Sequence, residues 1–249
     1  MSATVIVTGG NRGIGRSITE AFVKAGYTVV VGARTEQNIQ AIDPKHVIFH
    51  AMDVRDETAH KTLAKTAIDV TGRLDAWVNN AGISGWKPIN EIDETFFDEL
   101  MGINLKGAFW GCKAAAQFMT DTGGSIVNIS SIAGKRGSAN NAMYCATKFG
   151  MNGLTQSLAK ELGPKGIRVN AICPVLIKTD GLIDALMTKH SPANGNPMAF
   201  LDNFKKANSA TGELPTGQDV GDLAVYLASP QNHAITGQCI NVDCGVFPQ

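Results

Sequence analysis

Residues 3–15 read ATVIVTGGNRGIG, a short β-branched run that ends in a turn rich in glycine. The run predicts a buried strand over Ala3–Thr8, and the amphipathic stretch after the turn predicts a helix over Arg16–Ala25. Glycines between a strand and a helix permit positive φ angles and close approach of a pyrophosphate, which the helix N-terminus favours. Three residues separate Gly9 from Gly13, unlike the spacing G-x-G-x-x-G, so an ordinary glycine turn is the alternative. The strand–turn–helix context favours nucleotide binding.

Strand and helix patterns alternate along the rest of the chain. Further strands are expected at Thr28–Val31, Val47–His50, Leu74–Asn79, Ser125–Ile129, Ile167–Ile172 and Cys239–Val242. Helices are expected at Asp56–Thr71, Glu94–Thr120 and Ala142–Leu162. The alternation predicts an α/β protein: a single-domain Rossmann fold over residues 1–249, with a doubly wound, seven-stranded parallel sheet and helices on both faces. Prolines, glycines and asparagines interrupt residues 178–216, which we expect to be an insertion outside the sheet that acts as a substrate lid.

Composition excludes several classes of protein. The 249 residues carry a formal net charge of +0 and no run of like charges, so neither nucleic acid nor a membrane is an expected partner. The five cysteines include no C-x-x-C pair, which indicates reduced thiols in a cytoplasmic protein and no metal site. No signal peptide and no membrane-spanning run is expected.

A second stretch carries reactive side chains: residues 130–148 read SSIAGKRGSANNAMYCATK. Tyr144 and Lys148 are four residues apart, so on a helix they share a face. An ammonium beside a phenol favours the phenolate and lowers a pKa that is about 10 when unperturbed. We therefore expect a proton donor and acceptor that works near neutral pH, which beside a nucleotide fold suggests redox chemistry.

The residues after the second strand bear on the choice of nucleotide. NAD-binding folds place an acid on the ribose 2′-OH about twenty residues after the glycine turn. Here the strand leads into Arg34 without a carboxylate, and Arg12 in the turn can face the same place. Charge-assisted hydrogen bonds contribute roughly 1.5–3 kcal/mol each, so two cations favour the 2′-phosphate of NADP(H) over NAD(H). A solvated Arg34, with Glu36 on the ribose, is the alternative.

Asp53 and Val54 follow the third strand and are expected to meet the adenine. Asp53 could equally cap the next helix.

Three more signals stand in order: N-N-A-G at residues 79–82, Asn104 in the long helix, and Ser131 thirteen residues before Tyr144. With the T-G-x-x-x-G-x-G turn and Y-x-x-x-K, the chain resembles the classical short-chain dehydrogenase/reductase family over nearly its whole length. Each motif alone is weak, but all five in this order are specific. In that family the two longest helices form a subunit interface, so the resemblance implies a homotetramer. Helices buried within one monomer would have the same composition.

The resemblance implies roles for four catalytic residues. Ser131 would position and polarise a carbonyl, and Tyr144 would donate the proton. Lys148 would keep the pKa of Tyr144 low and bind the nicotinamide ribose, and Asn104 would hold a water that relays protons to Lys148. Ser131 is chosen over Ser130 by its spacing, and neighbouring strand residues point to opposite faces.

The expected cofactor contacts come from the glycine turn, the adenosine end, the N-N-A-G loop, the Tyr–Lys helix and the loop after the sixth strand. They are Gly9, Asn11, Arg12, Gly13, Ile14, Gly15, Arg34, Asp53, Val54, Asn80, Ala81, Gly82, Tyr144, Lys148, Pro174, Ile177 and Thr179. The expected substrate contacts are Ser131, Trp86, Asn141, Tyr144 and Val175. Val175 and Cys244 stand where the family usually has glycine, and a β-branched valine disfavours positive φ.

The resemblance implies an oxidoreductase that transfers a hydride between a nicotinamide cofactor and a ketone or secondary alcohol. Apolar residues mixed with amides near the expected pocket favour a polar small molecule, such as a sugar or polyol derivative. An NAD-dependent alcohol dehydrogenase, a ketoacyl-type reductase and an epimerase are alternatives within the fold. A catalytically silent nucleotide-binding regulatory protein is the alternative of another class. The presence of all four catalytic residues favours the enzyme.

Overall fold

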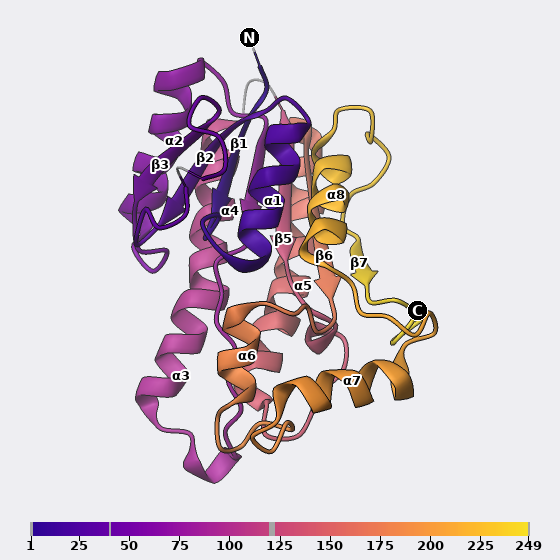
Figure 1. Cartoon of the computed structure of the whole chain (residues 1–249). Coiled ribbons are helices and arrows are strands. Elements are labelled where there is room, and N and C mark those ends of the chain that lie inside the picture. Colours follow the sequence, from indigo (N-terminus) through magenta and orange to yellow (C-terminus); the bar gives the residue numbers. More distant parts are fainter. Residues whose placement is uncertain (1, 40, 120–122, 249) are drawn as a thin grey trace.

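The computed structural model describes residues 2–39, 41–119 and 123–248. Within them seven strands form one parallel sheet in the order β3-β2-β1-β4-β5-β6-β7 (Figure 1). The strands are β1 (Thr4–Thr8), β2 (Thr28–Ala33), β3 (Val47–Ala51), β4 (Ala76–Asn79), β5 (Gly124–Ile129), β6 (Ile167–Pro174) and β7 (Cys239–Val242). The predicted seven-stranded, doubly wound parallel sheet is confirmed, and no strand boundary differs from expectation by more than two residues.

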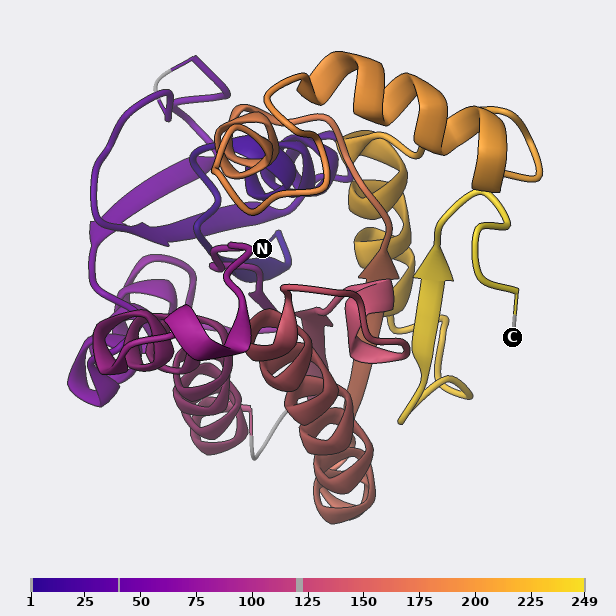
Figure 2. The same cartoon turned by 90° about the horizontal axis from the view of Figure 1, so that it is seen from below.

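Helices cover both faces of this sheet, as Figure 2 shows. One face packs against α1 (Gly13–Lys24) and α8 (Gly217–Ala228), the other against α2 (Glu57–Thr71), α4 (Gly107–Phe118) and α5 (Ala142–Leu162). Short 3₁₀ helices lie at Ile89–Glu91, Ile132–Gly134 and Gly163–Lys165. Strand residues alternate between the two cores, which explains why the strands are apolar throughout rather than at every second position. No helix in the described part of the chain is long and apolar enough to cross a membrane.

The long helix expected at Glu94–Thr120 is more complex than predicted. The structure has α3 (Glu94–Leu100), a π-helical segment over Met101–Lys106, and then α4, with helical φ and ψ kept at both junctions. Residue 120 lies outside the described residues. A π turn accommodates an additional residue without ending the helix, and such turns are frequent at functional sites. Here the π segment contains Asn104, whose side chain is completely buried.

The irregular stretch at residues 178–216 contains two helices, α6 (Asp180–Leu186) and α7 (Pro197–Asn208). They lie across the end of the molecule at which β6 and β7 finish (Figure 1). Each begins at a side-chain cap, from Thr179 and Asn196 respectively. α8 was not predicted, although Thr216 and Asp219 form the capping box that starts it.

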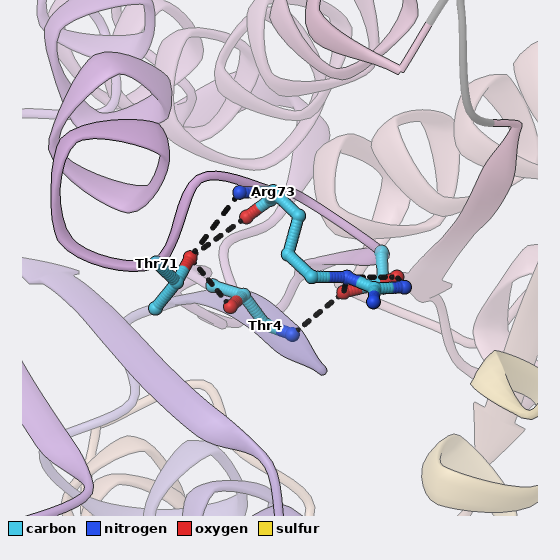
Figure 3. A network of polar contacts seen from close by, with 4 residues as sticks. Thr4, Thr71 and Arg73 are labelled. Atoms are coloured by element: carbon cyan, nitrogen blue, oxygen red, sulfur yellow. Dashed lines mark hydrogen bonds and ion pairs between the residues drawn. The ribbon is translucent and has the colours of Figure 1, made fainter. Parts of the chain in front are cut away.

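At the opposite end of the sheet, a network of hydrogen bonds and an ion pair connects β1 with the end of α2 (Figure 3). The Thr4 hydroxyl donates to Thr71 Oγ1 at 2.7 Å, and Thr71 Oγ1 in turn donates to the carbonyl of Arg73 at 3.0 Å. The backbone N–H of Thr4 donates to Asp75 Oδ2 at 2.7 Å, and Asp75 also pairs with the Arg73 guanidinium. These contacts tie the start of β1 to the end of α2, far from the end that carries the glycine turn.

Candidate active site

The glycine turn lies where the strand order of the sheet reverses, between β1 and β4. Ligands of open α/β sheets bind in the crevice at such a switch point. Polar contacts join the two loops there: Thr8 Oγ1 accepts from the N–H groups of Asn80 and Ala81, at 3.1 and 3.2 Å. The Asn80 amide donates to the carbonyls of Thr8 and Gly9, at 2.9 and 3.2 Å. Asn80 therefore holds the glycine turn in place.

The backbone of this turn has the shape that a phosphate requires. Gly9 and Gly13 have φ angles of +65° and +53°. A Cβ added to Gly15 would lie 2.1 Å from the carbonyl oxygen of Gly9, so only glycine permits this approach. No side chain caps the first turn of α1, where Arg12 is the N-cap and Ile14 lies in the first turn, so its N–H groups are available to an anion. These groups fit the pyrophosphate of a dinucleotide.

Residues at the adenosine end divide into two kinds. Arg12 and Arg34 are exposed, whereas Asn11 is buried and donates to the carbonyl of Thr35 at 3.0 Å. Asp53 pairs with Arg55 at 2.5 Å, and hydrogen bonds from Arg55 lower the pKa of Asp53. The alternative that Asp53 caps α2 is wrong, because the N-cap is Asp56, which accepts from Thr58 N. Val54 is half-buried and its carbonyl meets the His60 ring.

Ser131, Tyr144 and Lys148 come together beyond the carboxyl ends of β5 and β6. Tyr144 and Lys148 share a face of α5, with Lys148 Nζ 5.6 Å from the centre of the Tyr144 ring. The Ser131 hydroxyl lies close enough to the Tyr144 phenol to lower its pKa. The Ser131 hydroxyl also accepts from Ala133 N at 3.0 Å and lies 3.4 Å from the carbonyl of Pro174. Ser130 is buried and donates to the carbonyl of Lys148 at 3.3 Å, so the two serines face different surroundings.

The protonation of this pair differs from expectation. Burial raises the pKa of Tyr144 to about 12, and the nearby Ser131 hydroxyl lowers it by less. Burial likewise lowers the pKa of Lys148 to about 8. The expectation that the ammonium lowers the pKa of Tyr144 is therefore wrong for this structure. Lys148 Nζ donates to the carbonyl of Ile129 at 2.8 Å and is not hydrogen-bonded to the phenol oxygen, so desolvation dominates both groups.

Asn104 clamps the loop that follows β4. Its amide donates to the carbonyl of Ile83 at 2.8 Å, and its Oδ1 accepts from Ile83 N at the same distance. It also donates to Thr147 Oγ1 at 3.3 Å. A Cβ on Gly82 would lie 3.3 Å from Asn104 Oδ1 and 3.8 Å from Lys148 Nζ, so both side chains flank Gly82. The contacts seen are thus those of a residue that positions the loop.

The start of the irregular stretch at residues 178–216 meets the glycine turn. Thr179 Cγ2 lies 3.6 Å from the point where a Cβ on Gly13 would stand, and Thr179 Oγ1 accepts from Leu182 N. Ile177 is buried in the core on the α1 side of the sheet. Pro174 ends β6, and its carbonyl accepts from the Ser131 hydroxyl at 3.4 Å.

The remaining expected substrate residues lie in three environments. Trp86 packs on an apolar cluster of the lid, which includes Leu182, Ile183, Leu186, Phe200 and Leu214. Val175 packs with Ile132 and Val246, and its φ is not positive, so the valine strains no backbone. Cys244 does have a positive φ, of 53°. Asn141 is 6% exposed, and its Oδ1 has no hydrogen-bond partner among the described residues.

Three functional contacts were missed by the sequence analysis. Thr8 Oγ1 joins the two loops, Thr147 Oγ1 supports Asn104, and the carbonyl of Ile129 holds the Lys148 ammonium. Thr8 was visible as the first letter of the glycine motif. The contacts of Thr147 and Ile129 depend on how α5 packs and leave no signal in the sequence.

Comparison with known proteins agrees with this geometry. The family described as short chain dehydrogenase matches residues 3–189. The chain is 36% identical over 260 aligned residues to L-2,3-butanediol dehydrogenase of Corynebacterium glutamicum, with 99% of each chain covered. It is 35% identical over 259 aligned residues to a 3-oxoacyl-(acyl-carrier-protein) reductase of Staphylococcus aureus, again with 99% of each covered.

Two solved structures extend the likeness to three dimensions. A variant of the actinorhodin polyketide ketoreductase with NADPH gives a TM-score of 0.90 at 29% identity, over 98% of this chain and 97% of that one. ElxO with NADP bound gives a TM-score of 0.88 at 32% identity, over 100% of both chains. The family model matches most of the chain, two relatives are covered over almost their whole length, and the fold is shared. The chain belongs to the short-chain dehydrogenase/reductase family, and it is an oxidoreductase that acts on alcohol and ketone groups.

Proposed function

We propose that this protein interconverts a ketone and a secondary alcohol with NADP(H), using Ser131 and Tyr144 to bind the carbonyl oxygen. The observation that carries the proposal is the placement of the Ser131 hydroxyl close to the Tyr144 phenol, with Lys148 Nζ 5.6 Å from the centre of the Tyr144 ring. Both groups can donate to one oxygen, as stabilisation of a developing alkoxide requires. When bound, the cofactor supplies or accepts the hydride.

The raised pKa of Tyr144 suits the reductive direction. A phenol with a pKa of about 12 keeps its proton at neutral pH and can act as the general acid. Ser131 orients the carbonyl toward Tyr144, and Lys148 offers hydrogen-bond donors beside Gly82 for ribose hydroxyls. Asn104 keeps the Ile83 loop in position, and its expected role in a proton relay to Lys148 stays a prediction.

Preference for NADP(H) is supported by charge at the adenosine end. Arg12 and Arg34 are both exposed, and the carboxylate of Asp53 is engaged by Arg55. The two guanidinium groups suit a 2′-phosphate better than a free hydroxyl. Both solved structures compared above carry NADP or NADPH by their names. The expected cofactor contacts remain those given for the sequence.

For the substrate we propose a small polar ketone, such as a hydroxyketone related to a polyol. Asn141 lies one helical turn before Tyr144, and its buried Oδ1 has no partner among the described residues. A substrate hydroxyl would satisfy that acceptor. Trp86 and the lid cluster provide an apolar wall for the carbon chain. A ketoacyl thioester is the second candidate, because the chain is 35% identical to a 3-oxoacyl reductase.

The test is a panel of hydroxyketones, diketones and ketoacyl thioesters, followed by cofactor absorbance with NADPH and with NADH. Turnover of a hydroxyketone with NADPH supports the proposal, and preference for the thioester selects the second candidate. Tyr144→Phe should reduce kcat by roughly 10²–10⁴-fold, because the general acid is lost, while NADPH binding measured by fluorescence stays unchanged. A Phe variant with most of its activity would remove Tyr144 from the mechanism. Wild type that binds NADPH and turns over nothing would indicate the regulatory alternative.

A further inference from the structure

Two cysteines outside the proposed chemistry lie on neighbouring strands of the sheet. In the register between β6 and β7, Cys239 pairs with Ala171, so Cys173 is its diagonal neighbour on the same face. Cys173 is completely buried, whereas Cys239 is half-buried on β7, which is an edge strand. All five cysteines are free thiols.

The surroundings give the two thiols different properties. Each thiol affects the other, so that the pKa of Cys239 is lowered and the pKa of Cys173 is raised. Lys135 donates from Nζ to the carbonyl of Cys239 at 2.7 Å, and its charge lowers the pKa of Cys239 further. Cys173 also has the Asn152 amide oxygen at 3.9 Å. The more accessible cysteine is thus the one that ionises more readily, and the buried one ionises less readily.

We propose that Cys173 and Cys239 form an oxidisable dithiol, in which Cys239 reacts with a hydroperoxide and Cys173 then closes a disulfide. The Cys239 thiolate attacks one oxygen of the peroxide and breaks the O–O bond. The other oxygen leaves as hydroxide or alkoxide, and Cys239 becomes a sulfenic acid. The Cys173 thiol then displaces the sulfenic oxygen as water, with its proton taken up by the leaving group. In total the thiol pair loses two electrons and the peroxide is reduced.

The fold allows the bond to close at the cost of a movement. Diagonal neighbours are farther apart than directly paired residues, so the strands must shift to bring the sulfurs to bonding distance. Every residue of β6 except Arg168 is buried. All four residues of β7 are half-buried, and β7 lies at the edge of the sheet. β7 is therefore the strand that can move.

We expect oxidation of the two thiols to affect the active site. Cys173 lies near both Tyr144 and Lys148. The residue before it, Ile172, accepts from the N–H of Ser130 at 2.8 Å, and the Ser130 hydroxyl donates to the carbonyl of Lys148. Movement of β7 would also pull the carbonyl of Cys239 from Lys135. We therefore expect the disulfide to lower turnover reversibly.

The experiment treats the purified full chain with hydrogen peroxide and maps its peptides by mass spectrometry. The expected product is one linkage between the Cys173 and Cys239 peptides, with loss of two hydrogen atoms, reversed by dithiothreitol. This readout needs no substrate, so its failure is separate from failure of the proposed function. Where the ketone assay works, activity should fall and recover together with the linkage.

Matched variants separate the pair from the other thiols. Cys239→Ser should abolish the linkage, whereas Cys244→Ser, a half-buried thiol five residues away, should leave it intact. Lys135→Met should slow the reaction with peroxide and Lys135→Arg should restore its rate, because a cation keeps Cys239 ionised. Oxidation of Cys239 to sulfinic acid without any linkage would overturn the proposal, as would a wild-type disulfide that joins Cys239 to a cysteine other than Cys173.

Discussion

The side chain of Lys148 is buried, and its ammonium donates to the carbonyl of Ile129. Because burial lowers the pKa of Lys148 to about 8, the charge is complete below that pH and is lost as pH rises through it. If substrate reduction needs the ammonium, kcat/KM should fall above about pH 8, rather than near the ordinary lysine value of about 10.4. Tyr144, with a pKa of about 12, titrates too high to cause this decline.

The pH profile of Lys148→Arg provides the check. Arginine stays charged to a pH above 12, so the decline should disappear even if the absolute rate is lower. A circular dichroism spectrum should show that the variant is folded. Should the decline persist at the same pH in the arginine variant, another group controls it.

The proposed preference for NADP(H) depends most on Arg34. It is exposed and stands where an acid would select NAD. Arg34→Asp should raise the NADH-to-NADPH ratio of kcat/KM by at least about tenfold, since it removes a charge-assisted bond of roughly 1.5–3 kcal/mol and adds repulsion. Lys24→Asp, at the far end of α1, is the control for the change in net charge. Unchanged selectivity in Arg34→Asp would place the 2′-phosphate site elsewhere.

At the scale of the elements, α4 packs against β4 so closely that it needs glycine at one position. A Cβ on Gly111 would lie 2.0 Å from Asn79 Oδ1 and 2.8 Å from Trp77 Nε1. These atoms belong to a buried network in which Trp77 donates to Asn79 at 2.8 Å and Asn79 to Asn128 at 2.9 Å. The glycine is thus required for packing and for these hydrogen bonds.

Gly111→Ala should therefore lower the free energy of unfolding by about 3 kcal/mol, from overpacking and unsatisfied polar groups. Gly153→Ala in α5 is the matched control, since nothing lies within 4 Å of its added Cβ. It should stabilise by about 0.5–1 kcal/mol through helix propensity. Urea unfolding at one protein concentration measures both. Equal stability of the Gly111 variant and wild type would contradict the described packing.

The elements also show how far sequence reasoning reaches. The helix at Ala142–Leu162 and the strand at Cys239–Val242 were predicted with their observed bounds, because local pattern and nearby glycines determine both. The π segment at Met101–Lys106 was not predicted. It contains Asn104, whose hydrogen bond to Ile83 joins segments that are distant in sequence, and local sequence patterns do not report such contacts. The motifs could indicate that Ser131, Tyr144 and Lys148 lie close together, but not that the pKa of Tyr144 is raised, since spacing does not report burial.

At the scale of the whole molecule, α4 and α5 present two aromatic side chains to the exterior. Phe109 is 43% exposed and Phe149 is 48% exposed, although each is on a helix that packs on the sheet. Exposed apolar side chains that lie on one face commonly mark an interface. The homotetramer expected from the family would bury these helices, and it remains a prediction for this chain.

Phe149→Glu should convert the expected tetramer into a smaller species, as measured by size-exclusion chromatography with light scattering. In a contact between identical faces, each new carboxylate would be buried near its symmetry copy without a counter-ion, which is strongly unfavourable. Val70→Glu is the control, because Val70 is 54% exposed but lies on α2. The control should keep the wild-type mass. A wild-type monomer, or a Phe149→Glu variant that keeps the tetramer mass, would show that α5 is not the contact face and that its aromatic side chain remains in water.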